Sequence, residues 1–378
     1  MTVLGRQPRL PARVVLFCPF MSAGLEKPGP RSWGAVPWSI APGPKNTICD
    51  VPGIRVGHLT VRRDHPFSAR TGITVVVPSA DMPKECLPAA GVVFNGTGEM
   101  TGLHQVNEWG ALETPVALTG TAALPTVLQG LSDHMFRICP ELGVTREPCL
   151  GVVAECDDMW LSDTRHPPLE PGHVSEAIAA ASEAQGEWGA VGAGTGMVSF
   201  EFKGGVGSAS RRVEFSSEVY HLGTLCLVNF GRAGDLIVAG RPVGHLPGEV
   251  VRDSGLVEPP AGSLVVIVAT DAPLGHHQLR RLAQRSALGM ARVGSQGAHG
   301  SGDLFLALST VGFRDDRESP WHAQPVLRND LMDEFFRAAV EATEEGILDA
   351  LFQASSEHGF AGRTVRKLPE DEVRRRLL

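Results

Sequence analysis

The sequence of 378 residues predicts an α/β protein. The first observation behind this prediction is the uninterrupted apolar run 264–268, which has the composition of a strand buried on both faces. The second is the alternation of short apolar segments with glycine-rich turns after residue 46, which is typical of strands joined by tight connections. The third is a pair of segments with apolar residues at helical spacing, one after Pro273 and one over 330–354.

The chain opens with 45 residues that contain prolines and glycines without any period. We therefore predict that residues 1–45 form a flexible extension, or an arm over a neighbouring subunit. A single folded domain is expected over residues 46–378, and its first half should be mostly sheet. Strand-and-turn units are expected at 50–58, 72–78, 91–94, 115–118 and 217–229.

Helices are expected at 121–131, at 174–187, after Pro273 and at 330–354. The alanine-rich segment 174–187 should end near Gly189, because glycine favours a helix C-terminus. In the last helix, Glu341, Glu344 and Glu345 are predicted to form a solvated face or a subunit contact.

The composition disfavours several classes of partner. A formal net charge of −8 and a pI near 5.9 argue against a nucleic-acid-binding surface. No run reaches the roughly 18–20 apolar residues of a membrane span. The apolar segment 13–20 is short and interrupted by proline, unlike a cleaved signal peptide. The seven cysteines have no metal-ligand spacing, so we expect reduced thiols in a cytoplasmic protein.

A Gly-Ser pair opens the apolar run. Ser263 would be held at the first residue of a rigid strand, and Gly262 can adopt positive φ and let the backbone approach closely. If the chain cuts itself between these two residues, Ser263 gains an α-amine with an ordinary pKa of about 7.7–8.0, which can act as general base for its own hydroxyl. The pair therefore indicates a self-processing hydrolase, although Gly-Ser is also a common loop-to-strand junction.

Other chemistries fit the chain less well. The glycine-rich segments 191–197 and 202–210 match neither the dinucleotide-binding pattern nor the P-loop pattern, and they are predicted to be tight turns or site-lining backbone. The adjacent His276 and His277 diverge on a helix and His299 lacks an H-E-x-x-H context, so no metal site is predicted. The sequence also lacks the G-x-S-x-G elbow of α/β-hydrolases.

Five motifs stand in one order across the chain, over about residues 46–365. They are Asn95–Gly102, Phe202–Gly207, Val228–Gly231, Gly262-Ser263 with Ala269–Leu274, and His299–Asp303. Each motif is weak alone, but in this order they resemble the DmpA-type L-aminopeptidase/D-esterase family, which includes the β-peptidyl aminopeptidases.

The resemblance implies a four-layer α-β-β-α sandwich that cleaves itself between Gly262 and Ser263 into chains 1–262 and 263–378. It also implies homotetramers of cleaved protomers, no cofactor, and short peptides, amides or esters as substrates. Carried over by motif, Ser263 is the nucleophile and its freed amine is the base. Asn229 is then similar to the oxyanion-hole amide, and Ser301 with Asp303 matches the pair that orients the nucleophile and its amine.

Two departures from the family pattern bear on substrate preference. Some relatives place a tyrosine near the segment 154–160, whereas the only tyrosine here is Tyr220. Some relatives carry glutamate at the acid position, and Asp303 is one methylene shorter. The sequence does not specify the preferred N-terminal residue, nor a choice among L-, D- and β-amino acids.

Three alternatives remain open at this level. An acyltransferase of the related fold would use the same acyl-enzyme, a non-catalytic and uncleaved binding or assembly protein would keep only the scaffold, and a nucleotide-dependent enzyme is a weaker alternative. Taken singly, Ser301-Gly302-Asp303 is also compatible with a turn, and Asn229 with a strand-end cap.

Overall fold

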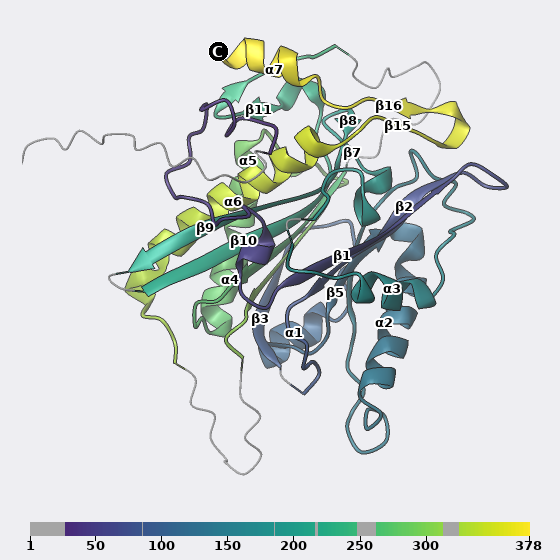
Figure 1. The fold of residues 1–378 in the computed structure, drawn as a ribbon, viewed down its shortest axis with the longest axis vertical. Helices are drawn as coiled ribbons and strands as arrows, with labels where there is room; N and C mark the ends of the chain where they lie inside the picture. Colours follow the sequence, from purple (N-terminus) through teal and green to yellow (C-terminus); the bar gives the residue numbers. More distant parts are fainter. Residues whose placement is uncertain (1–26, 85, 185, 216–217, 248–261, 313–324) are drawn as a thin grey trace, which may run out of the picture.

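The computed structural model describes residues 27–84, 86–184, 186–215, 218–247, 262–312 and 325–378 of the chain. Two β-sheets lie face to face, and helices cover the outer face of each sheet (Figure 1). The result is four layers, so the predicted α-β-β-α sandwich is confirmed.

The smaller sheet has the strand order β1-β2-β5-β6. Its strands are β1 (Arg55–Arg63), β2 (Ala69–Val77), β5 (Val116–Gly120) and β6 (Val152–Cys156). Its outer face packs on α2 (Leu124–Ile138) and α3 (Gly172–Ala179). The apolar side chains of this layer include Ile73, Val127 and Val174, all fully buried.

The larger sheet has the order β4-β3-β14-β13-β10-β9. Its strands are β3 (Leu87–Gly96), β4 (Ala111–Leu112), β9 (Gly205–Phe215), β10 (Glu218–Asn229), β13 (Ser263–Thr270) and β14 (Gly302–Ser309). Its outer face packs on α4 (His276–Gln284), α5 (Ser286–Arg292) and the long α6 (Met332–Gln353) (Figure 1).

Shorter elements complete the described chain. They are α1 (Leu103–Trp109), α7 (Glu370–Leu377), the strand pairs β7 (Val198–Ser199) with β8 (Phe202–Lys203), β11 (Ile237–Val238) with β12 (Arg241–Pro242) and β15 (Glu357–His358) with β16 (Thr364–Val365), and the 3₁₀ helices η1 (Ile48–Asp50), η2 (Thr121–Ala123), η3 (Gly192–Gly196), η4 (Ala233–Asp235), η5 (Asn329–Leu331) and η6 (Phe360–Gly362). Among the described residues, no helix has the length and apolarity needed to cross a membrane.

Strand β13 is buried along its whole length, as its composition predicts. Leu264 and Val266 face the outer helices, whereas Val265 and Ile267 face the smaller sheet. The strand pairs with β10 on one edge and with β14 on the other. Because it is packed on both faces and bonded on both edges, its first residue is held rigidly.

The acidic residues of α6 do not form a solvated face, so that prediction is wrong. Glu341 and Glu345 pair with the fully buried guanidinium of Arg211 on β9. Glu344 accepts a hydrogen bond from the Trp38 indole at 2.8 Å. Buried carboxylates persist only where cations and donors surround them. Sequence periodicity missed these partners because they come from distant parts of the chain.

Residues 27–45 of the predicted extension lie against α6 and differ from the flexible segment that the sequence indicates. Lys27 contacts Asp349 at 3.0 Å, and Arg31 donates two hydrogen bonds of 2.7 Å to Glu345. The buried carboxylates of α6 are therefore what anchors this segment. Residues 1–26, including the apolar segment 13–20, lie outside the described residues.

The alanine-rich helix is shorter than predicted, since α3 ends at Ala179. Gly189 does not end a helix. It has a φ of +86° and exchanges two backbone hydrogen bonds with Val206 at 2.6 and 2.8 Å. A Cβ at this position would lie 2.6 Å from the Gln353 carbonyl oxygen. The glycine thus permits a close crossing of chain segments.

The glycine-rich segment 202–210 forms β8 and the first half of β9, which the sequence did not predict as strands. A Cβ on Gly207 would lie 2.1 Å from the Gly346 carbonyl oxygen of α6. Glycine is needed here because the helix backbone lies directly on the strand. The other glycine-rich segment contains the buried turn η3, as expected for a tight turn.

Candidate active site

Ser263 is the first residue of β13, and only 8% of its surface is exposed. It stands opposite Asn229, the last residue of β10, in the antiparallel register. On its other side it stands beside Gly302, the first residue of β14, in the parallel register. Three motifs that are far apart in the sequence therefore meet at one end of three adjacent strands.

Gly262, immediately before Ser263, has a φ of +81°. A Cβ at this position would lie 2.3 Å from the Asn229 carbonyl oxygen and 2.4 Å from the Phe230 Cα. Both the backbone conformation and the lack of space require glycine here. The Cα of Gly262, immediately before the Gly262–Ser263 peptide, therefore lies close against the end of β10.

Ser301 and Asp303 lie next to the serine on the β14 side. The Ser301 hydroxyl donates to Asp303 Oδ1 at 2.7 Å, and the Gly302 N–H between them donates to Ser263 Oγ at 3.3 Å. Burial raises the pKa of Asp303, while the Ser301 hydrogen bond opposes this shift. In the described part of the chain, Asp303 Oδ2 is buried without a hydrogen-bond partner.

Asn229 is held by its side-chain amide on two sides. Its Oδ1 accepts the Val198 N–H at 2.8 Å, and its Nδ2 donates one hydrogen to the Asp157 carbonyl at 2.9 Å. An amide NH₂ has two hydrogens, so one remains for a further acceptor. The side chain is therefore fixed rather than a simple strand-end cap.

Glu155 is a site residue that sequence reasoning did not assign. It is buried near the end of β6, and its Oε1 accepts the Glu99 N–H at 2.9 Å. Its Oε2 accepts the Thr121 hydroxyl. A Cβ built on Gly98 would lie 3.2 Å from Glu155 Oε1 and 3.3 Å from the Cα of Gly302, which places the carboxyl close to the serine's neighbour. The available signal was an acid at the end of a buried apolar strand.

Comparison with known proteins gives the context of this site. Residues 46–365 match Peptidase family S58. The chain belongs to this family. It is 36% identical to the beta-peptidyl aminopeptidase BapA of Sphingosinicella xenopeptidilytica over 98% of this chain and 96% of that protein.

Solved structures agree with the family S58 assignment. A protein of Pyrococcus horikoshii OT3 superimposes with a TM-score of 0.86 at 38% identity, over 92% of this chain and 98% of that one. The L-aminopeptidase D-Ala-esterase/amidase of Ochrobactrum anthropi, described as a variant of the Ntn hydrolase fold, gives a TM-score of 0.86 at 32% identity, over 93% and 98%.

The family S58 assignment confirms the resemblance, the fold class and the aminopeptidase hydrolase function predicted from the sequence. The assignment argues against two of the alternatives that the sequence left open, the non-catalytic binding or assembly protein and the nucleotide-dependent enzyme. Lys203, in one of the glycine-rich segments, is fully buried and bonded to backbone carbonyls, so it does not face a phosphate site. In the ranges that the structure describes, no cluster of three His, Cys, Asp or Glu residues is arranged to hold a metal ion.

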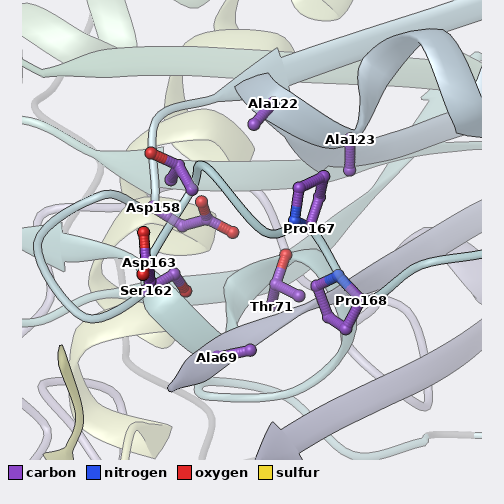
Figure 2. Close-up of a pocket in the computed structure, with 10 residues that line it drawn as sticks. Ala69, Thr71, Ala122, Ala123, Asp158, Ser162, Asp163, Pro167 and Pro168 are labelled. Carbon is purple, nitrogen blue, oxygen red and sulfur yellow. The ribbon is translucent and has the colours of Figure 1, made fainter. Parts of the chain in front are cut away.

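A small pocket lies beside two chain segments that contact this S58 site (Figure 2). Its lining includes Thr71, Ala122, Asp158, Ser162 and Pro168. Two neighbours of its lining residues bond to the site. The carbonyl of Asp157, next to Asp158, accepts from Asn229, and the hydroxyl of Thr121, next to Ala122, donates to Glu155. Burial raises the pKa of Asp158 to about 7.

Proposed function

We propose that this family S58 hydrolase cleaves its own chain between Gly262 and Ser263 and then removes N-terminal residues from short peptides, amides or esters through an acyl-enzyme on Ser263. The observation that carries the proposal is the pairing of a buried serine with an unpartnered carboxylate oxygen. Asp303 Oδ2 is buried without a donor at hydrogen-bonding geometry, although the nearby Leu264 N–H and Asn95 amide also lower the pKa of this carboxyl. A freed Ser263 amine on the neighbouring strand would supply a donor.

Self-cleavage balances as an N-to-O acyl shift. Ser263 Oγ attacks the Gly262 carbonyl carbon, the hydroxyl proton passes to the departing Ser263 nitrogen, and the peptide bond becomes an ester. Water then hydrolyses the ester, which gives a Gly262 carboxylate and regenerates the hydroxyl beside a free amine. The positive φ of Gly262 and the close approach of its Cα to the β10 terminus support this step, because they hold the residue before Ser263 in a strained, closely packed conformation.

In turnover, the Ser263 amine takes the proton from its own hydroxyl as the oxygen attacks the substrate carbonyl. The remaining N–H of Asn229 would donate to the oxyanion, a contribution typically worth about 10²–10³ in rate. The protonated amine then gives its proton to the leaving amine, and water hydrolyses the acyl-enzyme. Ser301 and Asp303 orient the amine and favour its protonated form during the reaction.

Glu155 is our candidate for the group that binds the substrate ammonium. It is buried close to Gly302, and two donors hold its carboxyl in place. A buried carboxylate attracts a substrate cation strongly, since little water screens the charges. This assignment explains why an enzyme of this kind would act at amino termini.

Three finer properties belong to the same proposal. Two relatives carry the name beta-peptidyl aminopeptidase, and this name supports the proposal that β-amino acids are among the N-terminal residues this enzyme accepts. The exposed apolar side chains of Val93, Phe94 and Trp109 offer a contact surface for the expected homotetramer. The free thiols of the six described cysteines are consistent with a cytoplasmic, reducing compartment.

The test is intact-mass spectrometry of the purified protein, with N-terminal sequencing of any smaller chain. We expect two chains, the second of which begins with Ser263, and aminopeptidase activity that appears with them. Ser263→Ala should give one intact, inactive chain. Ser286→Ala is the matched control, because Ser286 is also buried but its hydroxyl has no hydrogen-bond partner among the described residues. An active, uncleaved Ser263→Ala protein would refute the proposal.

A further inference from the structure

Lys203 is fully buried, and its side chain bonds only to backbone carbonyls. Its Nζ donates to the carbonyls of Gly194, Met197 and Gly204 at 2.9, 2.7 and 2.8 Å. Burial lowers the pKa of this amine to about 7. An apolar side chain would fill the space without the penalty of burying an amine. The directed hydrogen bonds of Lys203 therefore have a use beyond packing.

The three carbonyls belong to the chain that folds around the β7–β8 hairpin. Gly194 lies in η3, Met197 precedes β7, and Gly204 follows β8. The turn of the hairpin contains Phe200 and Glu201, which both have positive φ, at +50° and +63°. Residues other than glycine are strained in this region, so the hairpin needs external restraints to keep its shape.

One of the three bonds leads directly to Asn229. The carbonyl of Met197 and the N–H of Val198 belong to the same peptide group, which is planar. The carbonyl accepts from Lys203 Nζ at 2.7 Å, and the N–H donates to Asn229 Oδ1 at 2.8 Å. Fixing one end of this peptide fixes the direction of the other end.

The Met197–Val198 peptide group also transmits polarisation from Lys203 to the Asn229 side chain. Hydrogen bonds in series strengthen one another inside a protein. The Lys203 donor on the Met197 carbonyl therefore makes the Val198 N–H a better donor, most strongly when the amine is protonated. A stronger bond at Asn229 Oδ1 then makes the Nδ2 hydrogens more positive, which suits an amide that stabilises an oxyanion.

We propose that Lys203 is a positioning residue for the hydrolase reaction, which orients and polarises the Asn229 amide through the Met197–Val198 peptide. This inference rests on the proposed oxyanion role of Asn229. The inference explains why a lysine stands in this glycine-rich segment, where its amine bonds to backbone carbonyls and does not face a phosphate site.

The experiment compares kcat and KM of the self-cleaved enzyme, referred to the cleaved fraction by intact mass. We expect Lys203→Met to lower kcat by about 10- to 100-fold with little change in KM, which is less than the loss of the whole Asn229 donor in Asn229→Ala. Val198→Pro breaks the same connection but leaves the Met197 carbonyl free to accept from the lysine, because the proline ring replaces the N–H that Asn229 Oδ1 accepts. Met197, at φ −75° and ψ 141°, has the conformation that a residue before proline requires.

Ser199→Ala serves as the control for loosening the hairpin, since the Ser199 hydroxyl anchors it to the Phe230 carbonyl at 2.8 Å without touching the Met197–Val198 peptide. It should retain most of the activity. Adding Lys203→Met to Asn229→Ala should lower kcat little further, because the connection is already lost.

The outcomes separate two failures. If Asn229→Ala lowers kcat but folded Lys203→Met and Val198→Pro do not, the inference is wrong and the proposed function stands. If Asn229→Ala leaves kcat unchanged, its oxyanion role and this inference both fail. If Lys203→Met does not fold but Val198→Pro does, the kcat of Val198→Pro decides whether the proposal holds. If neither variant folds, the lysine is a structural residue and the proposal is overturned.

Discussion

Ser301 donates its hydroxyl hydrogen to one oxygen of Asp303, at 2.7 Å, while the other oxygen of the same carboxylate is buried without a partner in the described chain. The carboxylate stands in the register position beside Leu264, one residue after the serine. A buried acceptor without a donor is unfavourable. The pair therefore has one oxygen fixed by Ser301 and one available for the amine that cleavage would release.

The first prediction concerns Asp303 itself. Asp303→Asn should lower kcat/KM on the order of 10²-fold or more, because the amide lacks the charge that supports the protonated amine. Asp303→Glu should recover part of the activity, since some relatives carry that acid. Steady-state kinetics on an aminoacyl p-nitroanilide checks both variants, and equal activity of the asparagine variant and the wild type would contradict the assignment.

The second prediction is a pH shift produced by Ser301. A hydrogen bond to the ionised form lowers the pKa of a carboxyl, so its loss in Ser301→Ala should raise the pKa of Asp303 further above its ordinary value of 3.8. If the ionised carboxylate is the active form, the acid limb of the rate profile moves to higher pH. Rates measured from pH 4 to pH 9 on the cleaved enzyme test this, and an unmoved acid limb would show that Asp303 does not set it.

The third prediction uses two glycines of similar conformation. Gly262→Ala should prevent self-cleavage, because the new Cβ would lie 2.3 Å from the Asn229 carbonyl oxygen. Gly240 has a similar positive φ, +76° against +81°, but a Cβ there meets nothing within 4 Å. Gly240→Ala therefore reproduces the backbone strain without the steric conflict. Intact mass over time should show cleavage in this control and none in Gly262→Ala.

The fourth prediction concerns recognition of the substrate amine. Glu155→Gln should raise KM for substrates with a free amino group by about 10-fold or more, because the neutral amide loses its attraction for the ammonium. Glu113→Gln is a suitable control, since Glu113 is also partly desolvated but follows β4, which pairs with the opposite end of β3. If both variants keep the wild-type KM, the ammonium is bound elsewhere.

The candidate residues that the sequence singles out do meet in the fold, because each lies at or beside the end of a strand with a strong local pattern, whereas their catalytic roles stay a prediction. Ser263 begins a continuous apolar strand, and Asn229 ends another. The order of the motifs, rather than any single one, made the prediction specific. The contacts that bring these strand ends together are long-range pairings, which only the assembled sheet reveals.

The parts that the sequence missed share a physical cause. Glu155 has no motif of its own, and the gathering of Glu155, Gly98 and Gly302 depends on how the two sheets pack. The glycines of β9 predict turns, since glycine is rare in strands, whereas in the structure they allow α6 to lie on the sheet. The charges of α6 match a solvated face in the sequence because their partners lie between 130 and 314 residues away in the chain.

The last prediction follows from those partners. Burial alone would raise the pKa of Glu345, but Arg211 and Arg31 overcome it and hold the pKa at about 2, below the ordinary 4.5. A carboxyl with a lowered folded pKa stabilises the protein above pH 4.5, and this contribution is lost as the pH falls toward 2.

Arg31→Ala should therefore lower the free energy of unfolding by about 1 kcal/mol at pH 7, since the arginine is partly exposed. The difference from the wild type should shrink between pH 4.5 and pH 2, because protonation of Glu345 removes the Arg31–Glu345 pair that only the wild type has. Arg328→Ala, which breaks an exposed pair with Asp330, should change stability by less than about 0.5 kcal/mol at any pH. Urea unfolding at several pH values measures both variants, and an Arg31→Ala protein as stable as the wild type at pH 7 would show that the N-terminal segment is not anchored through Glu345.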